Sequence, residues 1–243
     1  IGNIKSLLSL EKIENLNKND ILINCMGLLP HVFKDNSMSN RGCNDEIYRK
    51  YILINSIFPH NLEKLKLMKS LKVINITSDC VFRGDRGEYT ELDPSDYMWA
   101  YGITKTIGEC PYICNIRSSI IGEEIKNKRS LLEWVRSNKN GQINGFENYY
   151  WNGITCLEMA KIIDEIIIKD FFWEGIRHVY SPRKVSKFEL VSLINKHYKL
   201  EISIKKQYLE KKIDRSLSSI YENYFLIPDI DEQIKELSEW DDE

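Results

Sequence analysis

Short apolar runs that alternate with amphipathic stretches constrain the fold of this chain most. Three runs have the length and the β-branched content of buried strands: ILINCMG (21–27), LKVINITS (71–78) and YICNIRSSIIG (112–122). Apolar residues at helical spacing precede each run, at 4–17, 46–68 and 100–109, with a polar loop at 30–46. Strands that are apolar throughout and separated by helices are typical of a parallel sheet covered on both faces.

After Gly122 the regular alternation of strands and helices ends, and a region of mixed α/β character follows. Helices are expected at 129–138, 155–169 and 187–198, with a short strand at 177–181. The helix at 46–68 continues past Pro59 only if it kinks there, because proline cannot donate a helical hydrogen bond. The sequence therefore predicts a doubly wound α/β sheet followed by a smaller mixed lobe.

The composition narrows the class of protein. Lys and Arg number 34 against 36 Asp and Glu, which gives a net charge of -2 and no overall basic field for nucleic acid. No apolar stretch reaches the roughly 20 residues of a membrane helix, and the N-terminus lacks the apolar core of a signal peptide. We therefore expect a cytoplasmic chain with reduced thiols and with neither a nucleic-acid nor a membrane partner. Cys110 and Cys114 form a lone CxxxC without a second pair, so no metal site is expected.

Polar residues gather where the predicted strands end, which is where open parallel sheets bind ligands. The segment NCMG (24–27) ends the first run, and TSD (77–79) ends the second. Tyr101 and Lys105 follow at the start of a helix, four residues apart and therefore on one face. By itself this spacing is typical of a surface pair.

The chemistry of a Tyr/Lys pair allows a catalytic function. A free tyrosine has a pKa near ~10 and is a poor acid or base at neutral pH. A lysine cation one turn away favours the phenolate and lowers that pKa. With the Ser78 hydroxyl holding a carbonyl oxygen beside the phenol, the set suits hydride transfer at a sugar or steroid carbon, with Tyr101 moving the proton.

These residues resemble a known family. The segment TSDCVFRGDRGEYTELDPSDYMWAYGITKTIGE (77–109) is similar to the active-site segment of extended short-chain dehydrogenases/reductases, and most similar to that of dTDP-4-dehydrorhamnose reductases. Those enzymes carry S-T-D-Y-V-F-D-G, then G-x-Y-x-E, then Y-G-x-(S/T)-K-x-x-G-E. Further similarity lies in DILINCMG (20–27), YILINSIFPHNL (51–62), NIRSSIIGE (115–123) and DRSLSS (214–219).

The resemblance implies a Rossmann-like fold and a role for individual residues. Residues 1–122 would form the dinucleotide-binding domain and 123–243 mainly the substrate-binding lobe, with 177–198 returning to the first domain. Tyr101 would be the acid, Lys105 would lower its pKa and bind the nicotinamide ribose, and Ser78 would hold the 4-keto oxygen. The other residues implied at the cofactor, NADP(H) or NAD(H), are Cys25, Met26, Gly27, Asn55, Ser118, Ser119 and Ile120. Those implied at the nucleotide-sugar are Asp79, Cys80, Trp151, Asn152 and Arg215.

Three departures from the family pattern bear on the substrate. Cys80 replaces a tyrosine that contacts the sugar in the family, and the segment 118–120 lacks an aromatic residue. The cluster Tyr149, Tyr150 and Trp151 is either core packing of the lobe or, with Asn152, an edge for a base or sugar.

A further departure is that no GxGxxG or GxxGxxG occurs in the sequence. In the family that loop cradles the cofactor pyrophosphate at a helix N-terminus. We expect that the chain starts inside the dinucleotide domain and that roughly 50–60 residues of the two βαβ units lie upstream of it.

The resemblance leaves several activities open. The leading hypothesis is NAD(P)H-dependent reduction of a 4-keto-6-deoxy nucleotide-sugar in deoxysugar or polysaccharide biosynthesis, with a homodimer as an allowed state. A nucleotide-sugar epimerase or dehydratase shares the Tyr/Lys pair, although Asp79 alone does not supply the acidic pair of a dehydratase. A non-catalytic subunit, similar to the regulatory subunit of methionine adenosyltransferase, is the alternative from another class.

Overall fold

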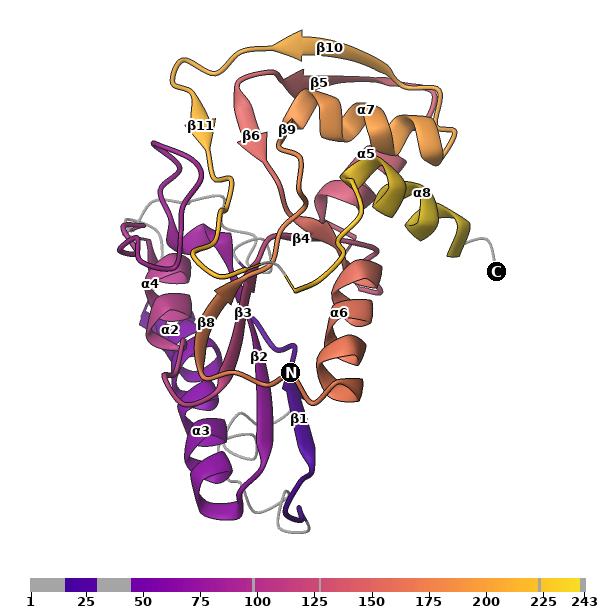
Figure 1. Cartoon of the computed structure of the whole chain (residues 1–243). Coiled ribbons are helices and arrows are strands. Elements are labelled where there is room, and N and C mark those ends of the chain that lie inside the picture. Colours follow the sequence, from indigo (N-terminus) through magenta and orange to yellow (C-terminus); the bar gives the residue numbers. More distant parts are fainter. Residues whose placement is uncertain (1–15, 30–44, 98, 127, 223, 241–243) are drawn as a thin grey trace. The chain divides into compact units, whose positions relative to one another are not determined.

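The computed structural model describes residues 16–29, 45–97, 99–126, 128–222 and 224–240 (Figure 1). The chain divides into two compact units, each built from separate segments. Unit 1 comprises 1–82, 94–117 and 172–177, and unit 2 comprises 83–93, 118–171 and 178–243. The segment that rejoins unit 1 is thus 172–177, whereas 178–198 clusters with unit 2. The predicted helix at 4–17 and loop at 30–46 fall almost entirely outside the described residues.

Unit 1 is built on a four-stranded sheet in the order β1-β2-β3-β8. Its strands are β1 (Ile21–Asn24), β2 (Lys72–Ser78), β3 (Cys114–Ser118) and β8 (Gly175–His178). β1 pairs with β2 in parallel, with Ile21 opposite Lys72, and the sheet as a whole is parallel. The expected Rossmann-like α/β fold is confirmed.

A row of buried asparagines crosses this sheet. The Asn24 Nδ2 donates to Asn75 Oδ1 at 2.8 Å, and the Asn75 Nδ2 donates to Asn115 Oδ1 at 2.9 Å. All three side chains are buried, so each amide would be costly without its partner. A shift of one residue in strand register would break both bonds, and the row therefore helps to fix the register of β1, β2 and β3.

The predicted single helix over 46–68 consists of three segments. They are α2 (Asp45–Tyr51), a π-helical turn η3 (Ile52–Ile57) and α3 (Phe58–Lys69). Pro59 lies at the start of α3 and has no N–H to donate to the Asn55 carbonyl four residues earlier. The expected disturbance near Pro59 is present, but it takes the form of the π turn that precedes the proline. Figure 1 shows α2, α3 and α4 (Ala100–Ile107) on one side of the sheet.

Unit 2 has the expected mixed character, with helices and short strands. Its helices are α5 (Leu131–Ser137), α6 (Cys156–Ile168), α7 (Lys187–His197) and α8 (Ile230–Trp240). The first three confirm the helices predicted at 129–138, 155–169 and 187–198, whereas α8 was not predicted. Its strands are β4 (Ile120–Ile121), β5 (Gln142–Phe146), β6 (Tyr149–Trp151), β7 (Ile154–Thr155), β9 (Val185–Ser186), β10 (Ser203–Gln207) and β11 (Ile213–Asp214).

The strands of unit 2 form three small sheets around one core. β10 pairs with β5, β4 pairs with β7, and β6 lies between β11 and β9. The core is apolar and includes Leu132, Val135, Trp151, Leu190, Ile194, Ile230 and Ile234. Three of the helices begin at a Ser or Thr whose side chain accepts the backbone N–H of a Glu three residues on: Ser130 to Glu133, Thr155 to Glu158 and Ser186 to Glu189. This S/T-x-x-E pattern marks a helix start in the sequence itself.

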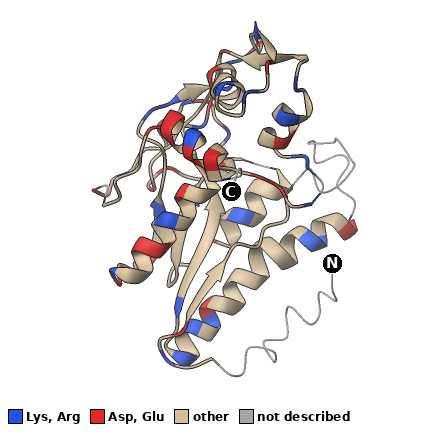
Figure 2. Ribbon diagram, turned by 90° about the vertical axis from the view of Figure 1, so that its right-hand side faces the viewer, with Lys and Arg blue, Asp and Glu red and all other residues tan. Residues whose placement is uncertain are grey.

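Charged residues of both signs are interspersed along the described helices (Figure 2). Lys50 pairs with Glu46 and Lys169 with Glu165, each four residues apart on one helix. No helix in the described part of the chain is both long and apolar enough to cross a membrane.

Candidate active site

The residues predicted to be catalytic lie together in unit 1. Ser78 is the last residue of β2, at the carboxyl end of the sheet, and Tyr101 and Lys105 lie in the buried part of α4. Gly27 follows β1 at the same end, and a Cβ on it would lie 3.0 Å from Lys105 Nζ. The sequence motifs at 24–27, 77–79 and 101–105 therefore converge, as open parallel sheets lead one to expect.

Tyr101 is buried among apolar neighbours. It forms a cluster with Leu28 and Tyr51, against which Cys80 and Ala100 pack, and its ring meets that of Tyr51 edge-on at 6.3 Å between centroids. Burial holds the pKa of Tyr101 well above its ordinary value, and the nearby Cys80 and Asp79 add to this, while a hydrogen bond with the Ser78 side chain opposes it. The phenol is accordingly protonated and able to donate.

Ser78 is held by its own turn. Its hydroxyl oxygen accepts from Cys80 N at 3.1 Å and caps the short 3-10 turn η4 (Asp79–Val81). The hydroxyl donates to Asp79 Oδ1, with 3.4 Å between the two oxygens. Because both Ser78 and Asp79 are buried, this turn fixes the hydroxyl beside the Tyr101 phenol.

Lys105 is a buried amine with few partners. Its Nζ donates to the Ile76 carbonyl at 3.3 Å and lies beside the backbone of Gly27. Burial lowers the pKa of Lys105 to about 8, although the carboxylate of Glu109 and the Cys80 thiol raise it in part. The cationic form thus prevails at neutral pH only by a small margin.

The expected effect of Lys105 on Tyr101 differs from what the structure shows. From the sequence we expect the cation to lower the pKa of the phenol, yet burial raises that pKa. The physical reason is that burial removes the phenolate from water, which raises the pKa of Tyr101. The buried amine of Lys105 is directed at the Ile76 carbonyl instead.

Asn55 lies in the π turn and ties three segments together. Its Oδ1 accepts from Leu28 N at 2.8 Å, and its Nδ2 donates to the Leu28 carbonyl at 3.2 Å and to Thr104 Oγ1 at 3.4 Å. Leu28 follows the NCMG segment, so Asn55 holds the end of β1 beside the helix that carries Tyr101 and Lys105. The π turn itself was missed, and Pro59 four residues after Asn55 was the signal for it.

A buried ion pair near Lys105 was also missed. Arg117 Nε and Nη2 donate to the two Glu109 oxygens at 2.8 and 2.5 Å, and Thr77 Oγ1 donates to the first of them at 2.9 Å. Both charged side chains are only 3% exposed. In the sequence, Glu109 is the last residue of the active-site motif, which ends in Gly-Glu. Its bidentate pairing joins β2, β3 and the end of α4 behind the catalytic residues.

The other residues predicted in unit 1 are less enclosed. Cys25 is exposed and is a free thiol, and partial burial raises its pKa. Met26 donates its backbone N–H to Asn24 Oδ1 at 3.1 Å, so the buried asparagine row extends into this segment. Cys80 is half-buried against the Tyr101 cluster.

Cys110 and Cys114, the two cysteines of the CxxxC segment, are buried free thiols. Burial raises the pKa of each thiol to about 12.

The remaining predicted residues lie in unit 2. Ser118 donates to the Ser119 carbonyl at 3.3 Å, and Ser119 also accepts from Ile154 N at 2.9 Å. Trp151 is 3% exposed and belongs to the core of unit 2. For this residue of the aromatic cluster, core packing is the alternative that agrees with the structure. Asn152 exchanges two hydrogen bonds with the backbone of Leu217, both at 2.8 Å. The side chains of Trp151 and Asn152 are thus engaged within unit 2 itself.

Arg215 lies in a group of cations and aromatic rings. Its Nη1 lies 3.3 Å from the Tyr149 hydroxyl, and Lys187 lies over the rings of Tyr149 and Trp151 at 5.5 and 4.9 Å. Lys184 and Lys212 lie over Tyr150 at 5.6 and 4.9 Å. The aromatic residues and Arg215 were predicted from the sequence, whereas the three lysines were not, because they carry no motif.

A comparison with solved structures identifies the fold. No protein-family model matches the sequence, and no curated protein matches it either. Among solved structures, the dTDP-4-dehydrorhamnose reductase of Clostridium acetobutylicum matches with a TM-score of 0.74 at 17% identity, over 99% of this chain and 86% of that one. The chain has the fold of these reductases.

Two further matching structures contain a bound cofactor. A dTDP-4-dehydrorhamnose reductase of Bacillus anthracis in complex with NADP matches with a TM-score of 0.73 at 19% identity, over 97% of this chain and 84% of that one. The dTDP-glucose 4,6-dehydratase of the same organism in complex with NAD gives 0.64 at 14% identity, over 99% and 77%. At such identities the likeness establishes the fold shared by these nucleotide-sugar enzymes and leaves the reaction to the residues of the site.

Proposed function

We propose that this chain is an NAD(P)H-dependent reductase of a 4-keto-6-deoxy nucleotide-sugar, acting in the cytoplasm in deoxysugar or polysaccharide biosynthesis. The observation that carries the proposal is the cluster of Ser78, Tyr101 and Lys105 at the carboxyl end of one parallel sheet. The cluster lies within a segment of more than thirty residues that resembles the reductases' active-site segment.

Tyr101 is the proton donor in this proposal. Its buried phenol keeps the proton at neutral pH, which is the form that a ketone reduction needs in its proton donor. The Ser78 hydroxyl, held by its turn, donates to the keto oxygen and places it beside the phenol. As the keto oxygen gains negative charge, the phenol proton moves to it.

Lys105 is the proposed contact for the nicotinamide ribose. Its cation lies one helical turn from Tyr101, and its amine has donors to spare after the bond to the Ile76 carbonyl. These spare donors fit the ribose hydroxyls of a nicotinamide nucleotide, and Gly27 leaves room there because a Cβ would approach the amine. The cofactor, when bound, supplies the hydride. Cys25, Met26, Asn55 and the segment 118–120 complete its site in this proposal, and either NADPH or NADH serves.

The nucleotide-sugar is the substrate in this proposal, with Asp79 and Cys80 on its sugar side. In unit 2, Arg215 is the proposed contact for the diphosphate, and the half-exposed rings beside it suit the base. Trp151 and Asn152 support that surface from the core behind it. A dehydratase remains the second candidate, because a dehydratase shares the fold and because Asp79 is buried beside Ser78.

The test is turnover with a matched control. Tyr101→Phe should abolish NADPH oxidation in the presence of a dTDP-4-keto-6-deoxy sugar, because the proton donor is gone, while leaving NADPH binding measured by tryptophan energy transfer within a few-fold. Tyr112→Phe removes a hydroxyl from an exposed tyrosine of the same unit and should leave turnover unchanged.

Two outcomes would contradict the proposal. Turnover that survives in Tyr101→Phe removes the phenol from the mechanism. Binding of NADPH without any turnover, in the wild-type chain and with several 4-keto nucleotide-sugars, favours the non-catalytic subunit instead.

A further inference from the structure

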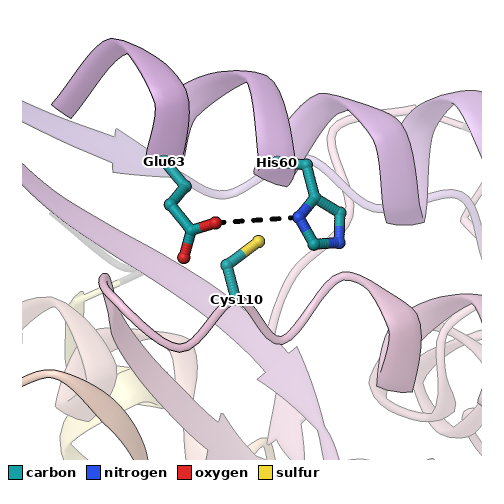
Figure 3. Close-up of side chains that lie close together, drawn as sticks. All are labelled: His60, Glu63 and Cys110. Atoms are coloured by element: carbon teal, nitrogen blue, oxygen red, sulfur yellow. Dashed lines mark ion pairs between the residues drawn. The ribbon is translucent and has the colours of Figure 1, made fainter. Parts of the chain in front are cut away.

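Three side chains of unit 1 that the proposed reaction does not use lie close together (Figure 3). His60 and Glu63 are one turn apart on α3, and Cys110 lies on the segment between α4 and β3. One atom of each, a ring nitrogen, a carboxylate oxygen and the sulfur, lies within 4.8 Å of the other two. The CxxxC spacing relates Cys110 only to Cys114, and nothing in the sequence predicted its approach to α3.

The orientation of His60 leaves a lone pair facing this space. Its Nε2 lies 2.9 Å from the Ile107 carbonyl, which can only accept, so Nε2 carries the proton. In the neutral ring the other nitrogen, Nδ1, then presents a lone pair toward Glu63 Oε2 at 3.8 Å. Two such acceptors favour a cation between them. A metal-bound histidine characteristically donates its second nitrogen to a backbone carbonyl in this way.

Hydrogen bonds also position Glu63 and the backbone of Cys110. Glu63 Oε1 accepts from Tyr112 N at 2.8 Å, which leaves Oε2 for another partner. The backbone of Cys110 is held by Asn115, whose Nδ2 donates to the Cys110 carbonyl at 2.7 Å, and Asn75 Nδ2 donates to the Gly108 carbonyl at 3.2 Å. The asparagine row of the sheet therefore fixes the segment that carries the sulfur.

From this geometry we propose that His60, Glu63 and Cys110 bind a zinc ion. One nitrogen, one oxygen and one sulfur form a ligand set that zinc accepts and that magnesium and calcium do not favour. A thiolate, a carboxylate and a neutral imidazole balance the charge of a divalent cation, and the thiol proton leaves to solvent on binding. His60 is half-exposed, with 47% of its side chain accessible, so water takes the fourth position.

The nitrogen and the oxygen need only a small closure, whereas the sulfur, which lies within 4.8 Å of both, moves by up to ~1 Å, because bonds of about 2.3 Å to sulfur and 2.1 Å to nitrogen place these atoms roughly 3.6 Å apart. Bonds of about 2.0–2.2 Å to nitrogen and oxygen in a tetrahedral site place those atoms roughly 3.4 Å apart, against the observed 3.8 Å between His60 Nδ1 and Glu63 Oε2. Such an ion joins helix α3 to the segment that leads into β3. Its effect is therefore on the stability of unit 1 and is independent of the proposed reductase activity.

The experiment uses the full chain after removal of bound metal with a chelator, and titrates it with Co²⁺ under anaerobic conditions. We expect one equivalent of Co²⁺ to produce thiolate-to-cobalt charge transfer in the near ultraviolet and the visible bands of tetrahedral cobalt, both lost on addition of Zn²⁺. Zn²⁺ should also raise the midpoint of thermal unfolding of the wild-type chain, since a ligand that binds only the folded state stabilises it.

The variants separate this site from other thiols. Cys110→Ala should lose the charge-transfer band, whereas Cys114→Ala, which removes a buried thiol outside the cluster, should keep it. Because Cys110 is fully buried, His60→Gln at the surface gives a second variant that keeps its fold by circular dichroism; it should lose the tetrahedral bands and the stabilisation by Zn²⁺. A wild-type chain without the band, a band that survives Cys110→Ala, or unchanged Zn²⁺ stabilisation in His60→Gln would each overturn the proposal.

Discussion

At Lys105 two effects oppose each other. Burial favours the neutral amine, whereas the Glu109 carboxylate one turn further on favours the cation, and the balance leaves a pKa of about 8. Glu109 is itself fixed by Arg117 and Thr77, so its charge cannot move away from the amine. Such a buried, poorly solvated cation costs stability, and it persists where the site uses it.

The first residue-scale prediction is therefore a gain in stability. The folded pKa of Lys105, about 8, lies below its ordinary 10.5, so between these values the unfolded chain binds more protons and stability rises with pH. Below pH 8 the full cost of the buried charge is present. Lys105→Met removes it and should raise the free energy of unfolding at pH 7 by on the order of 1–3 kcal/mol, measured by urea denaturation, while turnover is lost.

The control for this variant is Lys64→Met on the exposed surface of α3, which should change stability by less than about 0.5 kcal/mol. The advantage of Lys105→Met over the wild type should shrink as the pH is raised above 8, because the wild-type amine then loses its charge. An advantage that is constant from pH 6 to 10 would show that packing, and not the charge, is responsible.

At the scale of elements, α4 approaches the π turn through a glycine. A Cβ on Gly108, at the end of α4, would overlap the Asn55 carbonyl oxygen and lie 3.3 Å from Pro59 Cγ. Ser56 Oγ also donates to the Thr104 carbonyl at 2.8 Å. The carbonyl to which Pro59 cannot donate thus lies where α4 packs, and the two segments depend on one another.

This packing predicts a specific sensitivity. Gly108→Ala should lower the free energy of unfolding by about 1–3 kcal/mol, since the added methyl group forces α4 away from the π turn. It should also weaken NADPH binding, because Asn55 holds Leu28 and α4 together. Ile107→Ala, at the adjacent and exposed position, should cost less than about 1 kcal/mol and leave binding unchanged; equal effects of the two changes would refute the argument.

On the scale of the whole molecule, the chain leaves unit 1 and returns to it. The fourth strand, β8, follows α6 in sequence, yet Gly175 N donates to the Ile113 carbonyl at 3.1 Å and Asn115 Nδ2 donates to the Gly175 carbonyl at 3.2 Å. Unit 1 is therefore incomplete without the segment 172–177.

Dividing the chain after residue 117 should consequently prevent unit 1 from folding. The fragment 1–117 lacks β8 and exposes the edge of β3, and an unpaired apolar edge promotes aggregation. We expect this fragment to give no dispersed amide spectrum by NMR when expressed alone, and to give one when it is co-expressed with 118–243. A folded spectrum from 1–117 alone would show that β8 is dispensable.

Local patterns in the sequence determined the type of most elements and the location of the proposed chemistry. Buried strands, helix starts with S/T-x-x-E and the motif from Thr77 to Glu109 depend on residues near one another in the chain, and these are readable before folding. The resemblance to the reductases, found on the same motif, indicated the fold correctly. The short strands of unit 2 were missed because their pairing partners are far away in the sequence. The helix α8 was missed although its buried Ile230, Ile234 and Leu237 have helical spacing.

Only the tertiary structure decided how deeply each side chain is buried and which groups it contacts. Burial reversed the expected shift of the Tyr101 pKa, and no spacing in the sequence reports how much water a side chain loses. The Arg117–Glu109 pair, the asparagine row and the approach of His60 and Glu63 to Cys110 join residues from different elements. Such contacts arise when the sheet brings distant segments side by side, and this is why the motif could be predicted from the sequence while the charge states of its residues could not.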